Sequence, residues 1–274
     1  MKNLRWIALL VCCALSCLTV PVAQGADLAN KKEIIKQARD AYYSLRRAGL
    51  SEFHANIKPT WEIALKKELQ ENPEGAQNGL KMLNGLHFSM TLNPAGKVTV
   101  EHRSDAPPPN EQVAQGFNQI YSGMDQAVSG FFATWSLFML TSPFPGDEID
   151  YQLQDVGGQY RLSYKDGNAD VITTMNKNLT ITEIVVNSPE FKSIIKPQLS
   201  KSSNGFLLNG YEGNYEPTAG SGSVQLKVRL NYQQVSGLEL PGTLDLDSVL
   251  DGAATQMQLV FSDYQVKTKQ QAAK

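Results

Sequence analysis

Apolar and polar residues alternate along most of the second half of the chain. After Pro145, segments with an apolar residue at every second position are separated by turns such as Gly157-Gly158. A period of two is typical of antiparallel strands that have one covered face and one solvated face. The predicted strands cover residues 149–153, 160–164, 171–174, 179–186, 206–211, 224–232, 238–246 and 257–266.

Two segments depart from this alternation. Residues 188–204 contain two prolines, and we expect them to form a longer connection between strands. The last strand changes phase, because Phe261 and Tyr264 fall on opposite parities. This change predicts a bulge or sharp bend near Ser262-Asp263.

The first half of the chain mixes the two periods. Residues 30–48 have an apolar face at helical spacing, with Asn30 as a capping residue and Gly49 as a stop. A long helix is predicted over 110–140, where Pro143 and Pro145 end it. The weaker predictions are helices over 60–69 and 73–83, a strand ending at Pro59, and a hairpin over 86–92 and 98–102.

These elements predict a mainly antiparallel β protein with inserted helices, of the α+β class. About eleven strands and three to four helices are expected, and the helices do not alternate with the strands as βαβ units require. We expect one strongly curved sheet with helices 30–48 and 110–140 on its concave face. The helical insertions are placed at about 60–84 and 110–140.

The first 25 residues have the pattern of a cleaved secretory leader. Lys2 and Arg5 precede an apolar run, and Ala23-Gln24-Gly25 supplies the small residues of a cleavage site. We therefore expect a periplasmic or secreted protein with a single domain over 26–274. Two alternatives stay open, namely an uncleaved membrane anchor and lipid attachment at Cys17.

Composition narrows the class of partner. The chain has 274 residues, 42% of them hydrophobic and 19% charged, which suits a globular protein with a sizeable core. Lys2 and Arg5 leave with the leader, so 23 of the 25 basic residues remain against 27 acidic ones. This balance argues against a nucleic-acid partner. Because all three cysteines, Cys12, Cys13 and Cys17, lie in the leader, the cleaved chain contains no disulfide.

The sequence contains no strong catalytic or metal-binding motif. Serine-hydrolase, zinc-protease, phosphate-loop and dinucleotide fingerprints do not occur. A metal pair of His87 and His102 is conceivable across the predicted hairpin, although a surface or core role explains both residues better. The acidic residues Asp245, Asp247 and Asp251 lack the spacing of a calcium loop. We expect no catalytic residue, no metal and no cofactor, while a dispersed pair of carboxylates stays open.

The unusual feature is the aromatic end of the long helix. Its largest apolar residues are Phe131, Phe132, Trp135, Phe138 and Met139. Apolar residues there point in nearly every direction around the helix. One interpretation is a helix buried on two sides, and the other is a lid over a hydrophobic cavity. Gly130 on one side and Pro143 and Pro145 on the other offer hinges for such a lid.

Several stretches of the chain together resemble the LolA/LolB-type lipoprotein-localisation superfamily. They are the opening helix from Ile34-Ile35 to Leu45 with the strand around Phe53, the segments 136–140, 151–153, 157–158, 160–164 and 179–184, and the closing segments 232, 237–241 and 261–266. The resemblance implies an eleven-stranded half-barrel whose concave apolar face is capped by helices and receives lipid chains. The chain departs from this pattern at 58–110, and no position matches the family's lid-latching arginine.

The resemblance implies an envelope carrier that binds lipid, or the acyl chains of a lipoprotein, non-covalently and without catalysis. The five residues of the aromatic helix end are the predicted lid. The predicted cavity wall is formed by Phe88, Met90, Tyr160, Leu162, Tyr164 and Phe206. We expect a monomer whose partners are lipid or acylated lipoprotein and an envelope membrane component. The alternatives are an envelope scaffold with a filled core and a hydrolase with a dispersed carboxylate site.

Overall fold

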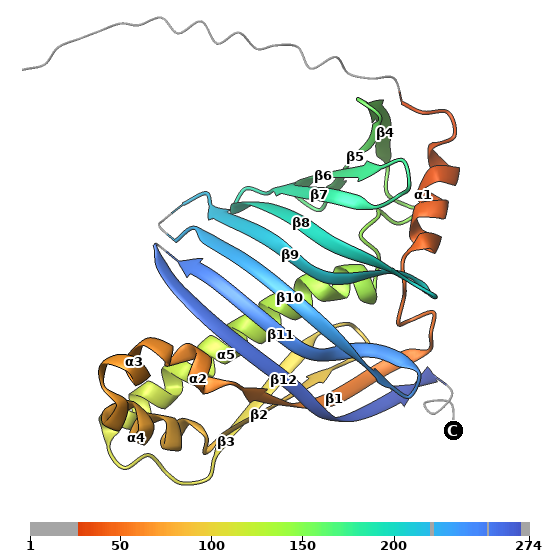
Figure 1. Cartoon of the computed structure of the whole chain (residues 1–274). Coiled ribbons are helices and arrows are strands. Elements are labelled where there is room, and N and C mark those ends of the chain that lie inside the picture. Colours follow the sequence, from red (N-terminus) through yellow and green to blue (C-terminus); the bar gives the residue numbers. More distant parts are fainter. Residues whose placement is uncertain (1–26, 220–221, 251, 270–274) are drawn as a thin grey trace, which may run out of the picture.

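The computed structural model describes residues 27–219, 222–250 and 252–269. They form one open antiparallel sheet of twelve strands, in the order β3-β2-β1-β12-β11-β10-β9-β8-β7-β6-β5-β4 (Figure 1). The expected leader and its three cysteines lie outside the described residues. The sheet is strongly curved, which confirms the predicted fold class of a half-barrel with inserted helices.

The strands run through most of the chain. The first three are β1 (Leu50–Pro59), β2 (Leu86–Leu92) and β3 (Val98–Ser104). The meander continues through β4 (Tyr151–Val156), β5 (Gln159–Asp166), β6 (Ala169–Asn176), β7 (Ile181–Asn187) and β8 (Phe191–Ser202). The longest strands close the chain: β9 (Gly205–Pro217), β10 (Val224–Val235), β11 (Leu238–Leu250) and β12 (Ala253–Thr268).

The helices are few and unequal. They are α1 (Lys31–Ala41), α2 (Trp61–Ala64), α3 (Lys66–Glu71), α4 (Pro73–Leu83) and α5 (Glu111–Met139). Helix α5 crosses the concave side of the sheet and contacts β3 and β9, while α2 to α4 gather beside its N-terminal half (Figure 1). We call the side of the sheet that α5 covers the covered face, and the opposite side the outer face. No helix in the described part of the chain is both long and apolar enough to cross a membrane.

The prediction of a longer connection over 188–204 is wrong, because most of this segment forms β8. This strand pairs with β9 from Phe191 to Ser202, which raises the strand count to twelve instead of about eleven. Pro197 is tolerated because β7 pairs with β8 only as far as Ile195, so no ladder bond is needed on that side of the proline.

The first two helices also end differently from the prediction. Helix α1 stops at Ala41 rather than 48, because Tyr42 turns extended and forms a bridge with Phe206 of β9. The Tyr42 hydroxyl donates to the Leu179 carbonyl and accepts from the Ile181 amide, at 3.2 and 2.8 Å. Tertiary contacts thus replace the last helical turns. The helix expected over 60–69 is divided at Leu65 into α2 and α3.

The predicted bulge in the last strand is confirmed. The pairing of β1 with β12 shifts register between His54 and Asn56, opposite Gln265 and Ser262. Asp263 takes a positive φ of 53° within this bulge. The bend returns the Tyr264 ring to the covered face, where it contacts Phe53 with the ring centroids 5.4 Å apart.

The bridge between α1 and β9 predicts a large effect of one substitution. A Cβ at Gly205 would lie 2.7 Å from the Ala41 carbonyl oxygen, and φ there is +122°. We expect Gly205→Ala to lower the free energy of unfolding by roughly 3 kcal/mol or more, since backbone strain and overlap add. The control is Gly157→Ala, where φ is +60° and a Cβ meets no atom within 4 Å. Strain alone predicts roughly 1 to 2 kcal/mol there; equal losses in urea unfolding would show that overlap at Gly205 adds nothing.

Candidate functional site

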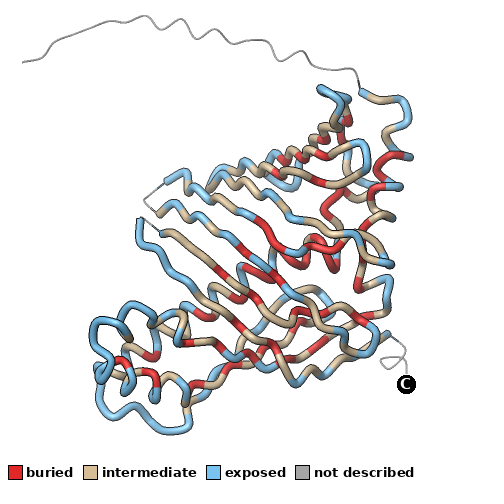
Figure 2. Tube along the Cα trace, in the orientation of Figure 1, coloured by how far each residue is buried: buried red, intermediate tan, exposed pale blue. Residues whose placement is uncertain are grey.

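The aromatic end of α5 lies in the centre of the core. Phe132 and Trp135 are 0% exposed, and Phe131, Phe138 and Met139 are also buried. The Trp135 ring meets Phe53 of β1 edge-on, with the centroids 6.3 Å apart. Buried residues lie along α5 and along the strands that cross it (Figure 2). In this structure the five predicted lid residues therefore fill the concave face themselves.

Polar contacts hold this half of the helix in one position. The Trp135 indole Nε1 donates to the Tyr232 hydroxyl at 3.2 Å, and that hydroxyl donates to the Leu208 carbonyl at 2.7 Å. Such a chain of buried hydrogen bonds fixes the rotation of α5 against β9 and β10. Helix α5 also runs without a break through Gly130, so the hinge expected there does not interrupt it.

The predicted wall residues do not form one cavity. Phe88, Met90 and Leu162 are buried, whereas Tyr160, Tyr164 and Phe206 are half-buried. Phe88 and Met90 lie on β2, near one end of the sheet, and residues 160–164 lie on β5, near the other. The Tyr160 ring is covered by the Lys177 ammonium, 3.7 Å from its centroid. These residues line separate parts of the core.

An open apolar groove lies elsewhere, between α3, α4 and the first half of α5. Its volume is about 460 Å³, within the roughly 300–1,000 Å³ of small-molecule sites. The lining is mostly apolar or without side chains: Leu65, Ala76, Met82, Leu83, Val113, Phe117, Ile120, Gly75, Gly79 and Gly116. The charged groups along it are Glu68 and Glu71. Met82 is 43% exposed beside this opening.

Capping residues and glycines shape this groove. The Asn72 side chain accepts from the Gly75 amide at the start of α4, and Asn110 accepts from the Val113 amide at the start of α5. A Cβ built at Gly79 or Gly116 meets no atom within 4 Å, so these positions face open space. Glycine inside a helix costs about 0.5–1 kcal/mol relative to alanine. Glycines at such costly helical positions are the signal in the sequence that could have located the groove, which the sequence-based prediction missed.

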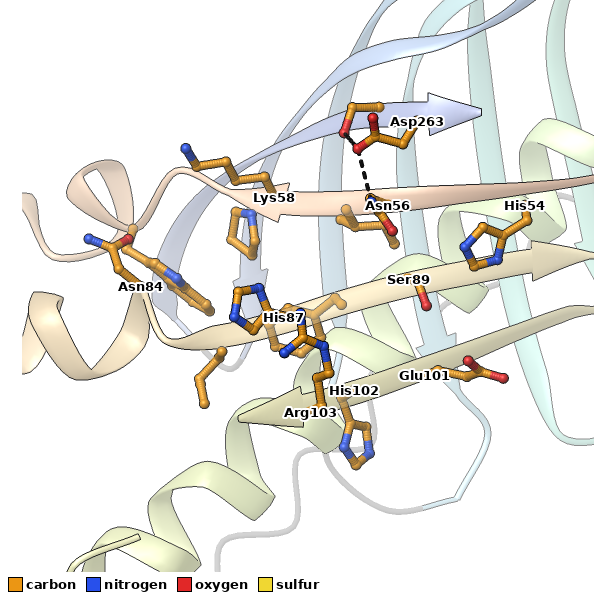
Figure 3. Close-up of a pocket in the computed structure, with 16 residues that line it drawn as sticks. His54, Asn56, Lys58, Asn84, His87, Ser89, Glu101, His102, Arg103 and Asp263 are labelled. Carbon is orange, nitrogen blue, oxygen red and sulfur yellow. Dashed lines mark hydrogen bonds between the residues drawn. The ribbon is translucent and has the colours of Figure 1, made fainter. Parts of the chain in front are cut away.

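A polar pocket of about 710 Å³ lies on β1, β2 and β3 and is drawn in Figure 3. Its side chains bond mainly across neighbouring strands. The Asn56 amide donates to Asp263 at 2.9 Å, as the dashed line shows, and a ring nitrogen of His54 lies 3.2 Å from the Thr91 hydroxyl. Two hydrogen bonds, from Asn56 and Ser262, hold the pKa of Asp263 below its usual value. These contacts stabilise the sheet and assemble no nucleophile with an aligned base.

The predicted pair of His87 and His102 does not form, and Asp251 of the acidic cluster lies outside the described residues. His87 pairs with Asp105 on the outer face, at 2.7 Å from Nε2 to Oδ1, whereas His102 stacks on Tyr121 of α5 with the centroids 3.9 Å apart. Their side chains thus lie on opposite faces of the hairpin. Among the described residues no three metal-binding side chains come together.

Comparisons with protein-family models, with characterised proteins and with solved structures find no match. The function therefore has to be inferred from the groove and the core themselves.

The packing of Trp135 predicts its effect on stability. Trp135→Ala should lower the free energy of unfolding by about 3–5 kcal/mol, as truncation of a buried aromatic side chain does. The control is Ser129→Ala on the exposed side of the same helix, which should change it by less than about 0.5 kcal/mol. Urea unfolding measures both. A small loss for Trp135→Ala, together with weaker lipid binding, would identify this half of α5 as a lid.

Buried tyrosines predict a loss of stability in alkali. Burial raises the pKa of Tyr164 and Tyr211 to about 12, and it also raises the pKa of Tyr42, Tyr232 and Tyr264. A pKa raised by folding gives stability that is complete below the unfolded value of about 10 and falls as the pH rises toward the folded value. Between pH 10 and about pH 12 the free energy of unfolding should therefore fall less steeply with pH in Tyr211→Phe than in the parent, by about 1.4 kcal/mol per pH unit. An unchanged slope would contradict this assignment.

Proposed function

We propose that this protein is an exported envelope carrier that binds a single apolar chain, of a lipid or of an acylated lipoprotein, non-covalently and without catalysis. The observation that carries this proposal is the groove between α3, α4 and α5, which is open to solvent and lined mostly by apolar side chains and glycines. Soluble proteins rarely expose such apolar concavities without a ligand or partner.

The groove suits a narrow, unbranched chain. Gly75 and Gly79 lie one turn apart on α4, and Gly116 lies on the facing part of α5. Because glycines carry no side chain, the helix backbones themselves form the surface that a chain would contact. Acyl chains of about 14 to 16 methylenes contribute on the order of 10 kcal/mol when fully buried, and micromolar binding needs about 8 kcal/mol. Burial of most of one chain is therefore sufficient.

The filled core favours one competing function. Because Phe132 and Trp135 leave no room beneath α5, an envelope scaffold with a permanent core accounts for that half of the helix. A scaffold, however, gives no reason for the open groove at the other half. A carrier should lose lipid binding when the groove is filled, whereas a scaffold should bind no lipid in either form.

Filling the groove tests the carrier directly. Gly116→Leu adds a side chain into the groove, and we expect it to abolish uptake of a fluorescent fatty acid by the protein purified from its own cells. The matched control is Gly123→Leu, two turns further along α5. A Cβ at Gly123 also meets no atom within 4 Å, but Gly123 does not line the groove. Both variants should fold at least as stably as the parent, because leucine favours a helix over glycine by about 0.5–1 kcal/mol.

Uptake that is equal in the two variants would exclude the groove as the binding site. Native mass spectrometry of the purified protein gives an independent measurement. A bound lipid in the parent and its loss in Gly116→Leu support the carrier. Absence of any bound lipid, together with no uptake of fatty acid, would favour the scaffold.

A further inference from the structure

The two edges of the open sheet differ in how they are covered. At the β4 edge the Leu28 amide donates to the Leu153 carbonyl and the Leu153 amide donates to the Asp27 carboxylate, both at 2.9 Å. At the other edge, β3 pairs with β2 over its whole length without a register shift. No other strand among the described residues pairs with β3. The β4 edge is thus capped at Leu153 by the chain itself, whereas the β3 edge carries no such backbone bonds among the described residues.

An open edge is a template for another strand, and β3 lacks two usual protections. It contains no proline and no bulge, whereas natural edges are often interrupted by one or the other. Pro107-Pro108-Pro109 begin only after the strand has ended. The backbone from Val98 to Ser104 is therefore regular enough to accept a partner strand by β-augmentation.

The charges on β3 select a partner and a register. Glu101 and Arg103 are exposed on the outer face, two residues apart. Figure 3 shows both residues on the strand at the margin of the sheet, with His102 between them. An antiparallel second copy of β3 centred on His102 would place each Glu101 opposite the Arg103 of the other copy. Both cross-strand pairs would then be attractive.

Neighbouring symmetric registers are less favourable. A pairing centred on Glu101 places two carboxylates directly opposite each other, and one centred on Arg103 opposes two guanidinium groups. A pairing centred on Val100 sets Lys97 against Arg103. One centred on Thr99 sets Lys97 against Glu101, but it pairs only residues 98–100 of the two strands. Like charges directly opposite each other destabilise a strand pair. Among these registers, only the one centred on His102 joins unlike charges within the strand.

In place of the monomer expected from the sequence, we propose that two copies of this chain associate through their β3 edges, antiparallel and centred on His102, to form a symmetric dimer with one continuous sheet. In the single chain Arg103 contacts Asp105 at 3.4 Å, and both side chains are well exposed. Replacing this contact with one to Glu101 of the other copy therefore costs little free energy. The interface is one short strand from each copy. It is smaller than that of a stable dimer, which predicts weak, concentration-dependent association.

Charge reversal tests the register. Glu101→Arg alone, or Arg103→Glu alone, turns both attractive pairs into repulsive ones, and we expect the dimer dissociation constant to rise about tenfold or more. The double variant Glu101→Arg/Arg103→Glu exchanges the charges and should restore association to near the parent value. Sedimentation velocity over a wide concentration range measures all four proteins. A parent that stays monomeric, or a dimer that the single variants do not weaken, would overturn the proposal.

A cysteine on the symmetry axis gives a second readout. Residue 102 of one copy lies opposite residue 102 of the other, with Cβ atoms roughly 4.5–5.5 Å apart, so His102→Cys should form an intermolecular disulfide under mild oxidation. Val100→Cys is on the same face, but its two copies would be about 13 Å apart and should not cross-link. The parent chain in the same oxidant is the control for cross-linking that does not depend on residue 102. Equal cross-linking of the two variants would contradict the register.

Discussion

Burial of the Phe132 and Trp135 rings between α5 and the curved sheet joins the strands into one core. An open sheet of twelve strands has no closure of its own, so its covered face must be occupied by something else. The aromatic half of α5 supplies that apolar surface, and Phe53 and Phe261 meet it from β1 and β12. The Trp135–Tyr232 hydrogen bond then sets which side of the helix faces the strands. The position of α5 on the sheet and the aromatic composition of the core therefore both depend on this contact.

The same helix has a different character in its first half. There Gly116 and Gly123 face open space, and α3 and α4 stand beside the helix rather than over it. Glycines weaken the helix locally, and the loss is offset by the packing of the aromatic half into the core. A single helix of 29 residues therefore combines a fixed anchor with an open apolar surface. This division is what makes the proposed carrier compatible with a core that is already full.

The outer face and the margins of the sheet follow another constraint. Hydrogen bonds between neighbouring strands, such as Asn56 with Asp263, use much of the polar surface near β1. The β4 margin is closed by residues 27 and 28, which belong to the segment just before α1. At β3 the described sheet ends without a further strand, and α5 contacts β3 from the covered face. The proposed association through that strand therefore depends on the backbone as well as on charge.

The sequence by itself determined the class of fold and most of the elements. Alternation after Pro145 identified the meander, and the phase change between Phe261 and Tyr264 located the bulge, because both depend on the two-residue repeat of a strand. It did not determine β8, since Pro197 reads as a break unless the short reach of β7 is known. The sequence also predicted too long a first helix. The bridge that ends α1 at Ala41 joins Tyr42 to Phe206, which lies far away in the chain, so no local pattern reveals it.

The candidate site depended even more on tertiary structure. The aromatic end of α5 was conspicuous in sequence, but its pattern is the same for a lid as for a helix buried on two sides, and only packing distinguishes the full core seen here. The groove depends on which residues of α3 and α4 face α5, and the β2–β3 hairpin separates α4 from α5 in the sequence. No local period contains that information. Apolar patterning specifies that a residue is to be covered, whereas the fold alone decides what covers it.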